Sequence, residues 1–307
     1  MQAITLEVIL RAVFGVEERA TLERLRGLLV EFMTPPPALL AFVPALQRDL
    51  PLSPYRRFLR RRAAVDRELH AIIAARRRAP DTAARADVLS LLLAARDEAG
   101  APMSDGELRD ELVTMLIAGH ETTATALSWA FACILADPAV RARLEDEGGD
   151  DYLDAVIKET LRLRPILPDV VREVRAPYAL GGHELPVGAF VTPFIYAVHR
   201  RPDIYPEPER FHPERFLGVK ADPYAWFPFG GGIRRCLGMA FALYEMRVVL
   251  GTVLARARLR LDGPPVRVVR RTLTLAPSRG TRVVLEGRRA AAGPRPAATV
   301  AAARAAP

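Results

Sequence analysis

The segment from residue 200 to residue 229, RRPDIYPEPERFHPERFLGVKADPYAWFPF, limits the possible folds of this 307-residue chain more than any other part, because six of its thirty residues are proline. Proline lacks the backbone N–H that helix interiors and central strands need, so the segment forms neither a long helix nor an ordinary sheet. Structureless segments of this length are uncommon inside compact domains. We therefore expect an ordered, irregular meander that neighbouring elements hold in place.

Helical patterns fill most of the chain before this meander, since apolar residues recur there at spacings of three and four. The clearest helix begins at Ser104, where Glu107 completes a capping box, and ends at the Asp137-Pro138 pair. Its middle is apolar on nearly every side, so we expect it to be buried. The predicted helical segments are 1–33, 53–79, 88–100, 104–136, 138–147, 150–163 and about 236–255.

Short alternating runs between 166 and 193, with Gly-Gly and Pro-Val-Gly turns, predict a small sheet, and further runs after 256 predict closing strands. The expected class is therefore mainly α with small β-sheets. The Ala/Pro/Arg-rich end, residues 288–307, is low in complexity and is predicted to be a disordered tail.

Charge and cysteine content restrict the function classes and the compartment. A formal charge of +8 makes nucleic acid a conceivable partner, but the arginines are spread over helix faces and form no basic stripe with aromatic residues, so we expect no nucleic-acid binding. Cys133 and Cys236 do not have the spacing of a disulfide framework or a zinc knuckle, which favours a reducing, cytoplasmic location. The first eighteen residues have no basic start, and their apolar positions fall at helical spacing and are interrupted by charges, so they predict neither an export signal nor a membrane segment.

The strongest chemical signal is FGGGIRRCLG, residues 229–238, in which Cys236 follows a loop of three glycines and two arginines and stands at the start of a predicted helix. Glycines allow close approach of a flat ligand, while positive charge and a helix start favour a thiolate. Such a sulfur is a nucleophile or a metal ligand. A buried structural cysteine is the alternative, and no pattern pairs a histidine base with the loop for nucleophilic catalysis.

These ten residues resemble the cysteine-ligand loop F-x-x-G-x-[RH]-x-C-x-G of the cytochrome P450 family. The fixed positions of that pattern are occupied by Phe229, Gly232, Arg234, Cys236 and Gly238.

Three further motifs occur in the order that the family requires. AGHETT at 118–123 resembles its oxygen-activating helix segment, KETLR contains Glu159 and Arg162, and PERF contains Arg215. A zinc-protease interpretation of His120-Glu121 fails because H-E-x-x-H needs histidine where this chain has Ala124.

The resemblance implies a haem b cofactor whose iron takes the Cys236 thiolate as axial ligand, and a monooxygenase that inserts one oxygen atom from O2 into an apolar organic substrate. Gly119 would make room for dioxygen, Thr122 would donate a hydrogen bond to it and Glu121 would help to bring protons in. The loop residue Phe229 would lie against the cofactor.

It also implies that Arg234 and Arg172 pair with haem propionates, for which an always-charged, multidentate side chain is suited. Glu159, Arg162 and Arg215 would form a structural cluster that fixes the meander. Electrons would come from a ferredoxin-type or flavoprotein donor.

Relative to the family, the chain opens late: several helices and the first strands that precede its opening segment are absent, so we expect an N-terminally truncated P450 fold. Residues 1–287 would be the C-terminal, haem-binding portion of a single domain. The alternative to an enzyme is an inactive truncated remnant that acts, if at all, as an interaction module. The sequence does not identify the substrate.

Overall fold

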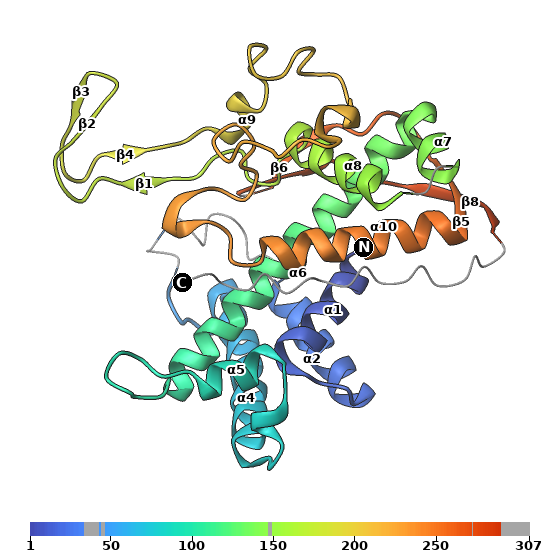
Figure 1. The fold of residues 1–307 in the computed structure, drawn as a ribbon. Helices are drawn as coiled ribbons and strands as arrows, with labels where there is room; N and C mark the ends of the chain where they lie inside the picture. Colours follow the sequence, from blue (N-terminus) through green and yellow to red (C-terminus); the bar gives the residue numbers. More distant parts are fainter. Residues whose placement is uncertain (34–42, 44–46, 147–148, 272, 290–307) are drawn as a thin grey trace. The chain divides into compact units, whose positions relative to one another are not determined.

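The computed structural model describes residues 1–33, 43, 47–146, 149–271 and 273–289, which are mainly helical and contain four two-stranded sheets (Figure 1). This confirms the predicted class. The chain divides into two compact units, one comprising Met1–Ala126 with Arg270–Thr274 and the other Leu127–Val269 with Leu275–Pro307.

The first unit consists of helices whose ends follow local rules. Gly15 ends the first helix in the left-handed conformation (φ 56°), with its N–H bonded to the Arg11 carbonyl, and so divides the predicted segment 1–33 in two. Before the helix that begins at Pro54, Ser53 accepts a hydrogen bond from the Arg56 N–H, and Pro54 is the first helical residue. The elements are α1 (Gln2–Phe14), α2 (Arg19–Met33), α4 (Pro54–Arg78), η2 (Thr82–Ala84) and α5 (Val88–Ala94).

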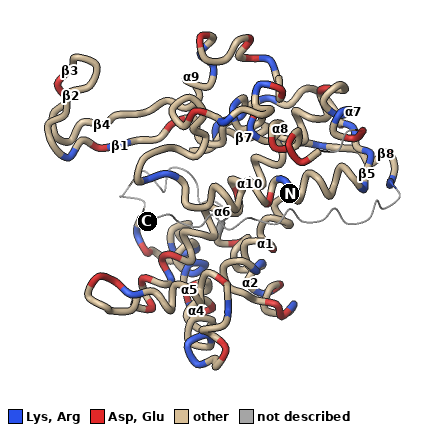
Figure 2. Tube along the Cα trace, in the orientation of Figure 1, with Lys and Arg blue, Asp and Glu red and all other residues tan. Residues whose placement is uncertain are grey.

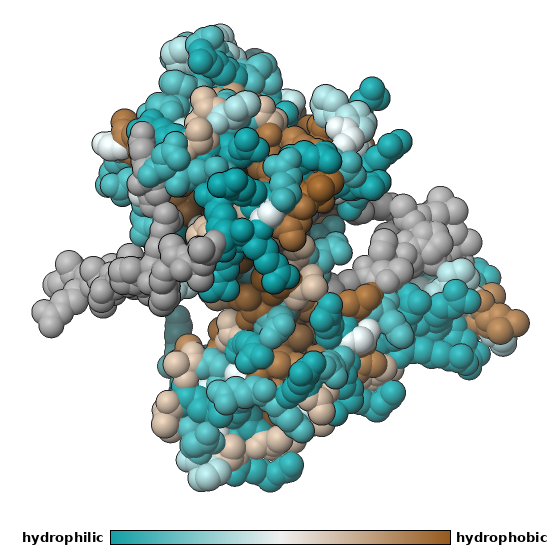
Figure 3. Space-filling view, turned by 90° about the vertical axis from the view of Figure 1, so that its right-hand side faces the viewer, coloured by the Kyte–Doolittle hydropathy of each residue, from teal (hydrophilic) through white to brown (hydrophobic). Residues whose placement is uncertain are grey.

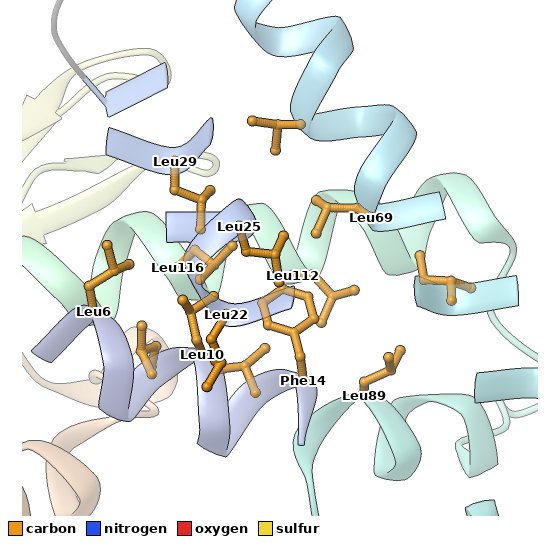
Figure 4. Close-up of a cluster of buried hydrophobic side chains, with 14 of the residues drawn as sticks. Leu6, Leu10, Phe14, Leu22, Leu25, Leu29, Leu69, Leu89, Leu112 and Leu116 are labelled. Carbon is orange, nitrogen blue, oxygen red and sulfur yellow. The ribbon is translucent and has the colours of Figure 1, made fainter. Parts of the chain in front are cut away.

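The core of the first unit is a cluster of aliphatic side chains around Phe14. Figure 4 shows leucines of α1 and α2 pointing toward Leu112 and Leu116 of the long helix α6 (Asp105–Ala136). At about 25 cal/mol per Å² of apolar surface removed from water, each fully buried leucine stabilises the unit by roughly 1.5–3 kcal/mol. This packing fixes the side of α6 that α1 contacts.

Helix α6 begins and ends where the sequence predicts. The Ser104 N–H donates to the Glu107 carboxylate at 2.8 Å, and the Glu107 N–H donates to Ser104 Oγ at 3.3 Å, which is the expected capping box. Asp137 ends the helix and caps the next one by accepting from the N–H groups of Ala139 and Val140.

The second unit contains four helices after α6, together with short strands and the meander. No strand occurs between 199 and 229 within the described part of the chain, as the prolines predict. The remaining helical elements are α7 (Pro138–Asp146), α8 (Asp150–Leu163), α9 (Ile195–Val198), η3 (Pro213–Phe216), η4 (Gly232–Arg234) and α10 (Met239–Arg256). The strands are β1 (Arg172–Glu173), β2 (Tyr178–Leu180), β3 (His183–Leu185), β4 (Phe190–Val191), β5 (Ala257–Leu261), β6 (Val268–Arg271), β7 (Thr274–Pro277) and β8 (Val283–Arg288).

The closing strands extend slightly beyond the predicted start of the tail at residue 288. Strand β8 pairs antiparallel with β5, and Arg288 lies opposite Ala257. The Arg289 N–H then donates to the Arg256 carbonyl at 2.9 Å, so main-chain pairing with β5 holds these two residues. The rest of the predicted tail, residues 290–307, lies outside the described residues.

Candidate functional site

The cysteine loop lies between the meander and α10 (Figure 1). The Cys236 N–H donates to the Phe229 carbonyl at 2.9 Å and closes the loop. Gly230 and Gly232 have φ angles of 69° and 66°, a left-handed conformation that a side chain would strain. The glycines of the motif therefore have a backbone role in turning the chain back to Cys236.

Helix α10 begins at Met239, three residues later than the start predicted at about Cys236. The reason is that the Cys236 N–H closes the loop, so Gly238 becomes the residue before the helix. Among the described residues no N–H group donates to the Cys236 sulfur. A Cβ atom on Gly238 would lie 4.0 Å from that sulfur, and glycine leaves the space open.

The Cys236 side chain is exposed and flanked by exposed apolar side chains. Ile233 and Leu237 have exposed fractions of 103% and 91%, which are unusual for large apolar residues. Exposed hydrophobic residues also form several patches on the face shown in Figure 3. A thiol between two open apolar side chains suits a flat, mostly apolar ligand with a metal at its centre.

A cavity of about 430 Å³ adjoins the loop. Apolar and glycine residues form most of its wall, and two arginines, Arg172 and Arg235, contribute the charged groups. The other lining residues are Val170, Pro193, Pro223, Tyr224, Trp226, Phe227, Pro228, Phe229, Gly230, Gly231, Gly232 and Met239. The structure thus brings Phe229 and Arg172 of the sequence prediction to one cavity.

The arginines predicted to hold propionates have little competition from carboxylates. Arg172, in β1, donates to the Val171 carbonyl at 2.9 Å. Neither it nor Arg234 forms an ion pair with any residue that the structure describes. Arg235, which the sequence analysis did not single out, lines the cavity and contacts the Met239 sulfur at 2.9 Å. These guanidinium groups are therefore available to an anionic ligand.

Glu159 and Arg162 form a fully buried ion pair on α8. The Arg162 guanidinium donates to both carboxylate oxygens, at 2.7 and 2.8 Å, and neither side chain has any exposed fraction. Arg215, on η3, donates to Glu159 Oε1 at 3.2 Å. Arg162 also donates to the meander carbonyls of His199, Pro208 and Arg210. The contacts join the meander to α8, which is the arrangement that the family resemblance implies.

His199 is a second point of attachment, which the sequence analysis missed. Its Nδ1 lies 3.2 Å from the Arg162 carbonyl, and its Nε2 accepts from the Phe227 N–H at 3.1 Å. Burial lowers the pKa of His199 to about 3, so the ring is neutral and Nε2 keeps its lone pair. Through Phe227 the ring supports the segment that enters the cysteine loop. A contact across 28 residues has no local sequence signal.

The AGHETT segment belongs to the first unit, whereas the cysteine loop belongs to the second. Thr122 donates its hydroxyl to the Ala118 carbonyl at 2.6 Å, a bond that helical threonine commonly makes. Glu121 is exposed and makes no hydrogen bond or ion pair with the described residues. A Cβ on Gly119 would lie 2.8 Å from Ile9 Cδ1, so a side chain at this position would require the end of the Ile9 side chain to move.

Charge and hydropathy add two general findings. Figure 2 shows basic and acidic residues interspersed along helices of both units. In the part of the chain that the structure describes, no single helix is long and apolar enough to cross a membrane, although the sharply bent pair α6 and α7 meets the length and composition criteria together.

Comparison with known proteins identifies the same family that the motifs resemble. The cytochrome P450 family model matches residues 1–281. "Putative cytochrome P450 135B1" of Mycobacterium tuberculosis is 46% identical over 270 residues. "Putative cytochrome P450 137" of the same species is 40% identical over 293 residues. The matches cover 84% and 92% of this chain, but the chain spans only 57% and 60% of these curated relatives.

Solved structures show the same fold. The retinoic acid-bound cyanobacterial CYP120A1 has a TM-score of 0.76 and 31% identity, and the match covers 92% of this chain and 67% of that one. The haem domain of cytochrome P450DA has a TM-score of 0.78 and 25% identity, with 94% and 67% coverage. The chain therefore belongs to the cytochrome P450 family of haem-thiolate oxidoreductases.

Proposed function

We propose that residues 1–287 form the C-terminal, haem-holding portion of a single P450 domain, and that the enzyme inserts one atom of O2 into an apolar organic substrate. The observation that carries this proposal is the exposed Cys236 thiol, whose backbone N–H donates to the Phe229 carbonyl and which has the exposed side chains of Ile233 and Leu237 beside it in the loop. This donor set fits haem b, because a thiolate ligates iron and aliphatic side chains contact a porphyrin face.

The roles of the loop residues follow from their chemistry. Cys236 would provide the thiolate ligand, and Phe229 lines the apolar wall of the adjoining cavity. Arg234 and Arg172 hold the propionates, since both guanidinium groups lack a competing carboxylate in the described ranges. Haem with a thiolate ligand supplies oxygen activation and O–O cleavage when it is bound.

The AGHETT residues handle oxygen and protons. The hydroxyl of Thr122, which donates to the Ala118 carbonyl, would supply a hydrogen-bond donor for dioxygen. Glu121 is exposed and carries protons from solvent toward the segment. Gly119 keeps the helix surface free of a side chain, in addition to its packing role against Ile9.

The substrate class and the partners are inferred from the family. An apolar substrate agrees with the retinoic acid bound to the similar cyanobacterial CYP120A1. Two electrons from a ferredoxin-type or flavoprotein donor and two protons from solvent would balance the reaction, with one oxygen atom leaving as water. Both cysteines are free thiols, which agrees with a reducing, cytoplasmic environment.

The decisive experiment is the absorption spectrum of the haem-loaded chain, reduced and exposed to carbon monoxide, in wild type and in Cys236→Ala. We expect a strongly red-shifted Soret band that Cys236→Ala abolishes. Cys133→Ala is the matched control, because desolvation raises the pKa of that α6 thiol to about 12 and leaves it neutral. An unshifted band in wild type, or a shifted band that survives Cys236→Ala, contradicts the ligand assignment.

A further inference from the structure

Helix α1 contacts α6 at the AGHETT segment itself. Thr5 and Ile9 are one helical turn apart on the same face of α1. Ile9 Cδ1 occupies the space where a side chain at position 119 would be, and Thr5 bonds to His120. Gly119 and His120, two adjacent residues of the AGHETT segment, thus contact Ile9 and Thr5 on one face of α1.

The Thr5 hydroxyl has three polar neighbours. His120 Nδ1 lies 3.0 Å from Oγ1, the His120 carbonyl oxygen 3.2 Å and the Gln2 carbonyl oxygen 3.3 Å. Thr5 is fully buried and His120 has an exposed fraction of only 6%. Water therefore does not replace these contacts, and a poorly matched set of donors and acceptors there would be costly.

Counting protons determines which ring nitrogen carries the hydrogen. A hydroxyl has one proton to donate, and the two carbonyl oxygens are both pure acceptors. If Thr5 donated to Nδ1, its oxygen lone pairs would face both carbonyls without a proton between them. If Nδ1 carries the hydrogen and donates to Oγ1, the hydroxyl proton is free to point to a carbonyl. The second arrangement gives both Thr5 Oγ1 and His120 Nδ1 a matched hydrogen bond.

The ring is neutral in this arrangement. Burial and the positive charge of the Met1 amine both lower the pKa of His120. With the hydrogen on Nδ1, Nε2 is a bare lone pair, and it makes no hydrogen bond within the described residues.

The same bonds hold the main chain of α6. The His120 carbonyl accepts from Thr5, and the Ala118 carbonyl, two residues earlier, accepts from the Thr122 hydroxyl. Added side-chain donors on helix carbonyls alter the local helix geometry. One of these donors comes from within α6, and the other comes from α1.

We infer that Thr5 is a positioning residue, which holds His120 in the Nδ1–H tautomer and thereby fixes the 118–122 turn of α6. The inference rests on the proposed function only for the consequence that this turn handles oxygen. Thr5 touches neither substrate nor cofactor and acts through His120.

The test uses the full chain labelled with ¹⁵N in its five histidines, and His120→Gln identifies the His120 signals. We expect the Nδ1–H signature in wild type and in Thr5→Ser, which keeps the hydroxyl, and its loss in Thr5→Val. Losing one buried hydrogen bond should also speed amide exchange in residues 120–124 by about fivefold. Circular dichroism shows whether Thr5→Val folds, and Thr5→Ala is the second variant if it does not.

A functional measurement then separates positioning from general stability. In the haem-loaded protein, Thr5→Val should lower the fraction of consumed O2 that appears in product by about fivefold, with an unchanged KM, and Thr5→Ser should restore it. If His120 keeps the Nδ1–H tautomer in Thr5→Val, the inference is overturned. It is also overturned if a variant loses that tautomer but the fraction of consumed O2 that appears in product does not change. A wild-type chain without a thiolate-type spectrum rejects the proposed function instead, and the imidazole and exchange data still decide the Thr5 contact.

Discussion

Asp87 joins three helices of the first unit through one carboxylate. It accepts hydrogen bonds from Arg76 at the end of α4 at 2.5 Å and from Arg85 at 2.9 Å. It also caps α5 by accepting from the Ser90 N–H at 3.0 Å. Arg76 and Arg85 in turn donate to the carbonyls that end α1, those of Phe14 and Gly15, each at 2.7 Å. The Asp87 side chain has an exposed fraction of 6%, so solvent does little to screen these charges.

The stability of the unit should therefore depend on the charge of Asp87. Burial alone would raise the pKa of Asp87, but the bonds from Arg76, Ser90 and Arg85 outweigh it and lower the pKa from 3.8 to about 2. The unfolded chain thus takes up the proton first as pH falls. The stabilisation, roughly 2 kcal/mol, is complete above about pH 4 and is lost as pH falls toward 2.

We expect Asp87→Asn to lower the free energy of unfolding by about 2–4 kcal/mol at pH 7, because two arginines lose their carboxylate. It should also weaken the loss of stability between about pH 4 and pH 2, as urea titrations at each pH would show. Asp203→Asn, which removes an exposed partner of Arg201, should change stability by less than about 1 kcal/mol. A change of less than about 1 kcal/mol in Asp87→Asn would refute the proposed role of the Asp87 carboxylate in joining the helices.

At the scale of elements, Gly119 marks the place where α6 lies against Ile9 of α1. Gly119→Ala has two opposing effects, because alanine stabilises a helix interior by about 0.5–1 kcal/mol relative to glycine, but the new methyl group would lie 2.8 Å from Ile9 Cδ1, so the end of that side chain must move. Ile9→Val removes that atom, so Gly119→Ala should be more favourable in the Ile9→Val background than in wild type, as a coupling in a double-mutant cycle of urea midpoints. Additive effects would mean that the two helices do not meet at this point.

The same pair of helices shows what a sequence reveals and what it does not. The limits of α6 were predictable because Ser104, Glu107 and Asp137 bond to their own neighbours in the chain. The Thr5–His120 contact was not, because it spans 115 residues and depends on how helices pack. The family resemblance predicted the Glu159–Arg162 pair, yet it contained nothing about His199, whose partners come from two distant segments. Local sequence patterns predict where helices begin and end, whereas polar contacts between distant segments can be identified only once the fold is known.

At the scale of the whole molecule, the proposed cofactor should be part of the stability of the folded chain. Ile233 and Leu237 beside Cys236 are open to solvent, and a ligand that covers them and bonds the thiolate binds only the folded loop. Binding at a hundred times the dissociation constant stabilises the native state by about 2.7 kcal/mol. For a chain of 307 residues that corresponds to a rise in Tm of roughly 4 °C.

Scanning calorimetry with and without added haem would measure this rise, and Cys133→Ala should show it undiminished. Cys236→Ala should lose most of it, since apolar contact alone leaves the iron without its protein ligand. A rise of equal size in Cys236→Ala would mean that haem is held by the apolar surface and not by the thiolate. Because the measurement needs neither substrate nor electron donor, it separates cofactor binding from catalysis.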